Sequence, residues 1–139
     1  MSKALKTLMR LARAEADAVR ARLLEAQDAH VRALSRIALL DAGLIEERAA
    51  AERHEIARPA YGPYAAARAD DRRVLTAEER ALAAQGDMLR AELAAAHAEM
   101  KKFERLIELE AAREAEAERM RELAQMDEIA TMRAGRERN

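Results

Sequence analysis

The sequence RPAYGP, residues 58–63, interrupts the helical pattern of this chain. A residue that precedes proline is pushed out of the helical region, so a helix is expected to end near Arg58. Pro59 and Pro63 each fix a backbone angle, and Gly62 permits angles that other residues avoid. This combination predicts a turn over residues 58–63, with a helix on either side of it.

Apolar residues repeat at alternating steps of three and four on both sides of this break, and the repeats form two seams. The upstream seam comprises Leu5, Met9, Ala12, Ala16, Val19, Leu23, Ala26, His30, Ala33, Ile37, Leu40 and Leu44. The downstream seam comprises Leu82, Gly86, Leu89, Leu93, Ala96, Met100, Phe103 and Ile107. Such spacing over several heptads is typical of supercoiled helices. It predicts an all-α fold in which residues 1–139 form one long antiparallel two-helix coiled-coil hairpin, with helices over about 2–57 and 64–133.

Folding the chain about Tyr61 and Gly62 predicts which seam residues meet. The expected partners are Leu40 with Leu82, Ile37 with Gly86, Ala33 with Leu89, His30 with Leu93, Ala26 with Ala96 and Leu23 with Met100. Several layers set a large side chain against a small one, as close helix packing requires. Pairing of each helix with another chain is the alternative, but the short turn favours pairing within one chain. His30 is expected to be a partly buried seam residue, so His30→Leu should be neutral or stabilising.

The composition argues against a thick globular core. Aromatic residues make up only 2% of the chain, so few large side chains are available to fill an interior. Charged residues make up 37%, and Ala, Glu, Arg and Leu prevail, which is typical of long helices. The net charge of −1 gives no indication of nucleic-acid binding. There is no cysteine for disulfides or thiolate metal sites, and no apolar run approaches the ~20 residues that span a bilayer.

No combination of residues indicates catalysis, so we expect no enzyme activity, no cofactor and no small-molecule substrate. His30, His54 and His97 lack the spacing of metal ligands. Helical bundles can build metal sites from a Glu-x-x-His motif, but no glutamate stands three residues before a histidine. The four glycines are scattered and form no phosphate-binding loop. Function is therefore expected at the surfaces and ends of the hairpin.

Two surfaces of the first helix are candidates for partner binding. One is the N-terminal stretch, which fits a groove on a partner protein or a membrane surface. Its apolar residues are Leu5, Leu8 and Leu11, and its basic residues are Lys3, Lys6, Arg10 and Arg13. The other is an apolar set off the seam, interpreted either as ordinary surface or as a partner-binding stripe. Its members are Leu24, Val31, Leu34, Leu39 and Ile45.

A third candidate surface lies near the C-terminus and reads MDEIATMR, residues 126–133. In the expected register the N-terminal end of the first helix lies opposite about residue 120, so this segment would extend past the hairpin as a single helix. An exposed amphipathic helix of this length is marginal in water by itself and is commonly a docking element. The residues expected to contact a partner here are Met126, Asp127, Glu128, Ile129, Met132 and Arg133.

This segment resembles the FliJ/YscO group of flagellar and type III secretion export components. Members of that group are small antiparallel coiled-coil hairpins that often end in a Met/Leu-Asp-Glu-x-Ala-x-x-Arg-like segment before a short basic tail. The matching residues are Met126, Asp127, Glu128, Ala130 and Arg133, followed by Arg136 and Arg138. The run of Leu5, Leu8 and Leu11 is similar to the start of the family. Known members often carry more aromatic and Gln residues along the hairpin, so no export-gate contact is assigned to individual residues.

The resemblance implies a cytoplasmic stalk, peripheral to the inner-membrane export apparatus, whose paired termini dock into a hexameric export ATPase. It also implies contact with the export gate membrane protein and with secretion chaperones. It does not distinguish a flagellar from a virulence-type secretion system. From the residues alone, a generic coiled-coil scaffold or oligomerisation module is the alternative, and a membrane-binding helix over residues 3–24 is a weaker third.

Overall fold

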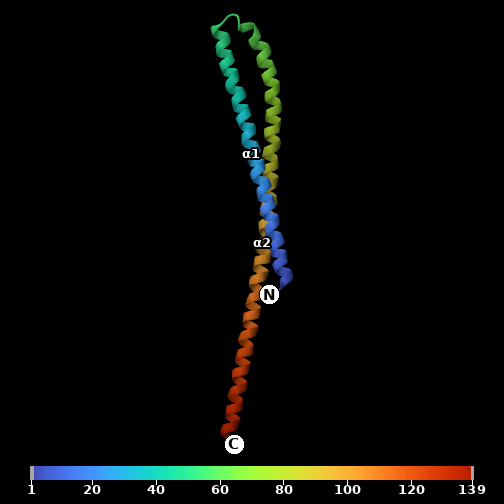
Figure 1. Ribbon diagram of the computed structural model, residues 1–139, viewed down its shortest axis with the longest axis vertical. Coiled ribbons are helices and arrows are strands. Elements are labelled where there is room, and N and C mark those ends of the chain that lie inside the picture. Colours follow the sequence, from blue (N-terminus) through green and yellow to red (C-terminus); the bar gives the residue numbers. More distant parts are fainter. Residues whose placement is uncertain (1, 139) are drawn as a thin grey trace. The chain divides into compact units, whose positions relative to one another are not determined.

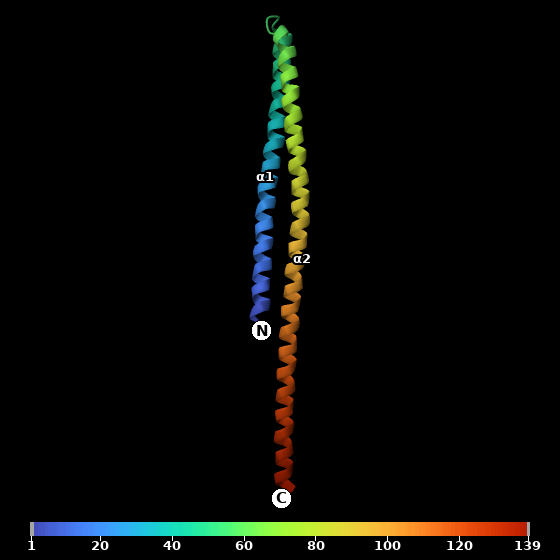
Figure 2. The same cartoon turned by 90° about the vertical axis from the view of Figure 1, so that its right-hand side faces the viewer.

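The computed structural model describes residues 2–138, which form two helices, α1 over Lys3–Arg53 and α2 over Arg58–Arg138 (Figure 1). The chain divides into two compact units. We call them the terminal unit, Met1–Glu15 with Ala96–Asn139, and the turn unit, Ala16–Ala95. Within each unit, a stretch of α1 runs antiparallel beside a stretch of α2 (Figures 1 and 2). The predicted all-α class and helical hairpin are confirmed.

The connection between the helices occupies residues 54–57, before the two prolines. His54 N–H donates to the Ala50 carbonyl at 3.0 Å, and Ala57 N–H donates to the His54 carbonyl at 3.0 Å. Arg58 Nε donates to the Ala51 carbonyl at 3.3 Å. The last carbonyls of a helix have no partner within it, and a cation there also complements the helix dipole. The Arg58 side chain therefore caps α1 from the first residue of α2.

The turn predicted over residues 58–63 is wrong, because these residues begin α2. Proline is tolerated in the first turn of a helix, where the N–H groups have no helical partner, so Pro59 does not oppose the helix there. Pro63 removes one helical hydrogen bond, and the helix continues through it. Gly62 has ordinary helical angles, since no glycine among residues 2–138 has a positive φ. The helices accordingly end at Arg53 and Arg138 rather than at about 57 and 133.

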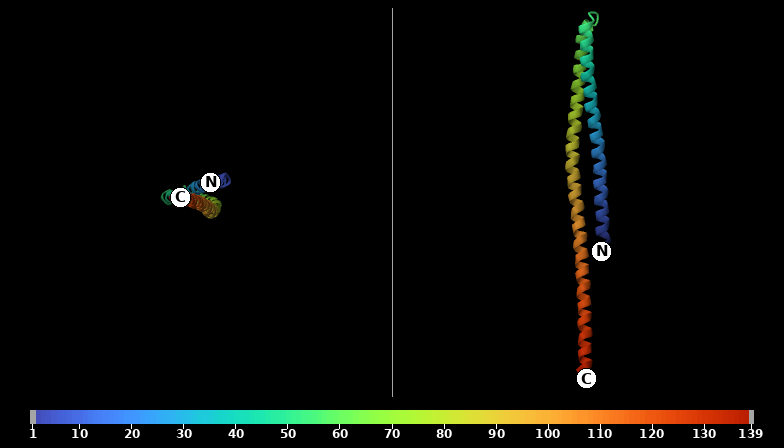
Figure 3. Two further views of the ribbon diagram at one scale, coloured as in Figure 1. Left: turned by 90° about the horizontal axis from the view of Figure 1, so that it is seen from below. Right: turned by 90° about the vertical axis from the view of Figure 1, so that its left-hand side faces the viewer.

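The turn unit is held together by the predicted seam. Leu23, Ala26 and Leu89 form its buried cluster, and Leu93 packs against them. Every predicted seam residue of this unit is buried or half-buried, whereas most of its other residues are exposed. Figure 3 shows the two helices side by side along this stretch. The seam was therefore predicted correctly as a set of residues.

The pairing across the seam differs from the predicted one. Ala26 and Gly86 line a common groove, whereas Ala26 was expected opposite Ala96, ten residues later. Leu23 packs with Leu89 instead of the predicted Met100. A seam with a period of 3.5 residues faces its partner equally well after a slip of one and a half heptads. The seam pattern alone therefore does not determine the register. The register is set by the position at which the chain reverses.

Polar side chains also join α1 to α2 in the turn unit. Arg72 donates from Nε to Asp41 Oδ1 at 2.9 Å and from Nη2 to Oδ2 at 3.2 Å. These hydrogen bonds, and the charge of Arg72, hold the pKa of Asp41 below its ordinary value. The further cross-helix ion pairs are Arg22 with Glu92 and Arg36 with Glu78, and His30 forms a hydrogen bond with Glu79. They all fit the register in which Leu23 meets Leu89.

In the terminal unit, Ser2 fixes where α1 begins. Its Oγ accepts from the Leu5 N–H at 3.4 Å, and its carbonyl accepts from Lys6 N–H at 3.3 Å, as an N-cap residue does. Its own N–H donates to Glu110 Oε1 at 2.7 Å, which sets the start of α1 level with Glu110 of α2. Met9 is buried in the same unit. Along the described chain, neither helix is long and apolar enough to cross a membrane.

Candidate functional site

The terminal unit contains a stretch of α2 that no other helix covers. From residue 111 to residue 138 every residue is exposed, while Glu110 is the last half-buried one. Figures 1 and 2 show this stretch, orange to red, continuing alone beyond the start of α1. We call residues 111–138 the extension. The prediction that residues 126–133 stand clear of α1 is confirmed, and the exposed stretch is longer than predicted.

Large apolar side chains are spread along the extension without cover. Their exposed fractions lie between 50% and 65%. They are Met120, Leu123, Met126, Ile129 and Met132. Met126 and Ile129 line one side of a shallow groove of about 470 Å³ together with Ala130, Arg133, Ala134 and Glu137. Methionine adapts its shape easily, so this surface suits contacts with a partner that moves or varies.

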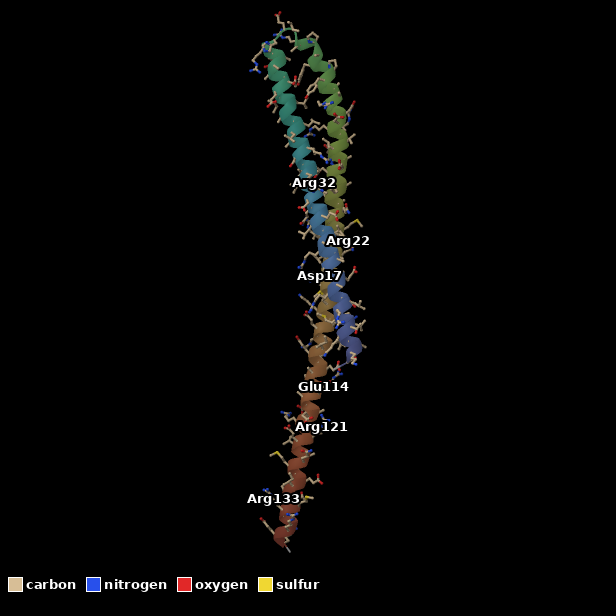
Figure 4. All side chains as sticks on the ribbon, in the orientation of Figure 1. Asp17, Arg22, Arg32, Glu114, Arg121 and Arg133 are labelled. Carbon is tan, nitrogen blue, oxygen red and sulfur yellow. The ribbon has the colours of Figure 1, made fainter. Side chains whose placement is uncertain are left out.

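Charges on the extension divide into two groups. Glu116 pairs with Arg119 at 2.8 Å, and Glu118 pairs with Arg121 at 2.7 Å, both one turn apart along the same helix. Such pairs stabilise a helix by roughly 0.2–0.5 kcal/mol each. By contrast, Asp127, Glu128 and Arg133 form no ion pair with any other residue of 2–138. Figure 4 shows Arg121 and Arg133 on this single helix. The charges near the C-terminus therefore remain available to a partner.

The N-terminal leucines lie elsewhere in the terminal unit. Leu5 is half-buried in the seam, whereas Leu8 and Leu11 are exposed. Because Ser2 is level with Glu110, Leu5 and Met126 are separated by about 28 Å along the helix axis at 1.5 Å per residue. The structure thus does not bring the two predicted halves of the site together. A partner that contacts both has to extend along the unit.

Met120 and Leu123 belong to the exposed surface but are not among the contact residues predicted from the sequence. The predicted register places the start of α1 level with about residue 120, whereas α1 begins level with Glu110. A signal was present in the sequence, because the seam loses its apolar character at Glu110 and Glu114. Charged residues at seam positions were a sign that the pairing ends there.

The turn unit has a groove of its own near the connection, where α1 and α2 diverge in Figure 1. Its volume is about 540 Å³. It is lined by Arg36, Leu39, Leu40, Gly43, Tyr64, Arg68, Asp71, Val74 and Leu75. Arg68 lies over the Tyr64 ring at 5.5 Å and pairs with Asp71 at 3.1 Å. No group of three His, Asp or Glu side chains within residues 2–138 is placed to hold a metal ion.

Two antiparallel helices, one of which continues as an exposed extension, define a class of protein: a helical hairpin with one helix longer than the other. The chain matches the family described as Flagellar FliJ protein over residues 1–139, and it therefore belongs to that family. Proteins of this family are structural components of flagellar export and not enzymes. No curated protein and no solved structure matches the chain.

Proposed function

We propose that this protein is a cytoplasmic stalk of the flagellar export apparatus that docks the extension into a hexameric export ATPase and stimulates it. The observation that carries the proposal is the exposure of every residue from 111 to 138 on a continuous helix. A helix without tertiary cover gains nothing from packing, so its apolar side chains are best explained by a partner that covers them. The centre of a protein ring can surround a single helix on all sides.

The charges of the extension support the same proposal. Asp127, Glu128 and Arg133 are exposed and have no ion-pair partner among residues 2–138. Charges across an interface govern orientation and encounter more than affinity. Met126, Ile129 and Met132 would supply the apolar contact, while the three charges would orient the helix in the ring. Leu8 and Leu11 would contact the rim of the same partner.

Coupling the ATPase to the export gate requires a second surface on the same chain. The groove of the turn unit is the best candidate, because it combines exposed apolar side chains with the Tyr64 ring and belongs to a different unit. We propose that the gate membrane protein contacts this groove. The stalk would then act at the periphery of the inner-membrane export apparatus. Secretion chaperones would bind one of the remaining surfaces. A generic scaffold function remains the alternative if no ATPase responds to the extension.

The test is the rate of ATP hydrolysis by the purified cognate ATPase with two variants of the stalk. The triple substitution Met126→Ala, Ile129→Ala, Met132→Ala removes the apolar contact, and truncation after Glu110 removes the extension. Both should leave the melting temperature nearly unchanged, because no residue after 110 is buried. Both should abolish stimulation of the ATPase.

A matched control is Met88→Ala, which truncates an equally exposed methionine of the turn unit. It should stimulate as the unaltered protein does. Full stimulation by the protein truncated after Glu110 would remove the proposal and leave the scaffold alternative. A large fall in melting temperature would mean that the extension is part of the fold.

A further inference from the structure

The face of α1 that points away from the seam carries a second apolar stripe in the turn unit. Its large members, Leu24, Val31, Leu34 and Ile45, have exposed fractions of 45–71%. At 100° per residue, they fall within an arc of roughly 80° together with Ala38, Ala42 and Ala49. An apolar arc of this width on the outside of a helix pair is the size that one further helix covers.

Apart from Leu24, whose counterpart is Glu52, the stripe is symmetric about Ala38. Steps of four, seven and eleven residues in either direction from Ala38 reach the pairs Leu34 and Ala42, Val31 and Ile45, and Gln27 and Ala49. A second α1 running antiparallel, with a twofold axis at Ala38, therefore meets the same stripe in reverse. The small residue on the axis lets the helices approach, and Leu34 then faces an alanine.

One border of the stripe carries charged residues whose order is complementary in charge to the same order read backwards. Residues 25, 32, 39, 46 and 53 are seven apart and therefore share this border, and they read Glu, Arg, Leu, Glu, Arg. About Leu39, which is 73% exposed, Glu25 is the counterpart of Arg53 and Arg32 that of Glu46. None of the four charged residues forms an ion pair with another residue of 2–138. In an antiparallel pair, like borders lie together, so every charge meets its opposite.

The other border is shaped to receive a side chain. Gln27 and Val31 line a groove of about 460 Å³ with Ala83, Gly86 and Arg90 of α2. In the antiparallel arrangement, Ile45 of the second copy is level with Val31 and reaches this groove. The partner helix would thus contact α1 and the edge of α2 together.

We propose that a second copy of this chain covers the stripe, with the two α1 helices antiparallel about Ala38 and Leu39. A foreign helix would need only the apolar arc. The reversal of charge about Leu39, one residue from the centre of the stripe, is required only by self-pairing. The contact spans about 45 Å of helix and about 10 Å of width, or roughly 400 Å² per copy. This is about half of a standard interface, so the dimer is weak and reversible. The proposal is independent of the proposed function, since the extension takes no part in it.

Sedimentation equilibrium of the full chain tests the proposal. The mass should rise from 15.5 kDa toward twice that value as the concentration approaches about 1 mM. Arg32→Glu or Glu46→Arg alone sets like charges together at two symmetric places, and should raise the dissociation constant about tenfold. Mixing these two variants, or combining both changes in one chain, should restore the original affinity. Glu47→Arg is the matched control, because the same change one residue away leaves the border intact.

A disulfide tests the position of the axis, since the chain has no cysteine of its own. Ala38→Cys should form a covalent dimer on mild oxidation. Ala42→Cys should not, because the two copies of that position are about 12 Å apart along the axis, beyond disulfide reach. A monomer at all concentrations overturns the proposal and leaves the stripe to another protein. Crosslinking of both variants alike, or failure of the charge exchange to restore affinity, overturns the antiparallel register.

Discussion

His30 Nε2 lies 2.8 Å from Glu79 Oε1, so a histidine of the α1 seam and a glutamate of α2 satisfy each other across the helix pair. Both side chains are largely covered, with exposed fractions of 29% and 22%. Burying a polar group costs free energy unless it has a hydrogen-bond partner. The bond therefore explains how a polar residue occupies a seam position.

His30→Leu should destabilise the protein by about 1 kcal/mol, because it leaves the half-buried Glu79 carboxylate without its partner. This reverses the neutral or stabilising effect expected from the sequence. The double variant His30→Leu, Glu79→Leu should recover most of the loss, since no polar group is then left unpaired. Urea unfolding measures both values, and a neutral His30→Leu would contradict the importance of the bond.

Gly62→Ala should stabilise the protein by about 0.5–1 kcal/mol, because alanine restricts the unfolded chain and fits a helix. An added Cβ at Gly62 meets no atom within 4 Å, and the residue has no positive φ. The measurement is the urea midpoint at an unchanged slope. If residues 58–63 formed a turn with Gly62 in a left-handed conformation, the same substitution would destabilise.

Leu23→Cys with Leu89→Cys should form a disulfide within one chain, because these two side chains share the buried cluster of the turn unit. The pair Leu40→Cys with Leu82→Cys is the control. These two residues would lie opposite each other in the register expected from a turn at residues 58–63. In the structure Asp41 pairs with Arg72, so Leu82 lies about 15 Å farther along α2 than the residues opposite Leu40. Gel mobility after oxidation separates the two registers, and crosslinking of the control pair would favour the other one.

Asp41→Asn should lower the melting temperature at pH 7, and the difference from the unaltered protein should shrink as the pH falls below about 4. Arg72 lowers the pKa of Asp41 in the folded state. A group with a depressed folded pKa contributes stability above its unfolded pKa, and this contribution is lost as the pH falls through the folded value. Asp28→Asn is the control, since Asp28 forms no ion pair with another residue of 2–138. A difference that stays constant with pH would contradict the assignment.

Amide hydrogen exchange should be faster over residues 111–138 than over the seam of the turn unit. The extension has no buried residue, whereas Leu23 and Leu89 are buried together. Local opening of an uncovered helix breaks no packing contacts, so its free energy is small. Mass spectrometry of peptides from each region makes the comparison. Equal protection in the isolated protein would mean that the extension is already covered, for example by a second copy.

The seam residues were predictable because burial follows the 3.5-residue period wherever two helices pack. Leu23, Ala26 and Leu89 are buried as expected. The pairing was not predictable from the same pattern, since a periodic seam matches itself after a slip. It depends on where the chain reverses, and there the prolines were misleading. Pro59 is compatible with a turn and with the first turn of a helix, and in the structure it lies in the first turn of α2, beside the Arg58 cap on Ala51.

The candidate site was predicted in part for the same reason. Residues 126–133 were expected to stand clear of α1, and they do, because any hairpin with unequal helices leaves the longer one uncovered. Met120 and Leu123 were missed through the error in register. The bond between His30 and Glu79 could not be predicted, since it depends on which turn of α2 stands beside His30.

The helical ion pairs of the extension have a consequence for the thermodynamics of docking. Fixing the backbone of one residue costs roughly 1–2 kcal/mol of conformational entropy, and a disordered tail would lose that amount residue by residue on binding. The extension is helical from 111 to 138, and Glu116 and Glu118 each pair with an arginine one turn farther along it. Most of this ordering cost is thus met during folding. A partner can then hold and release the helix with few contacts, as repeated cycles of engagement require.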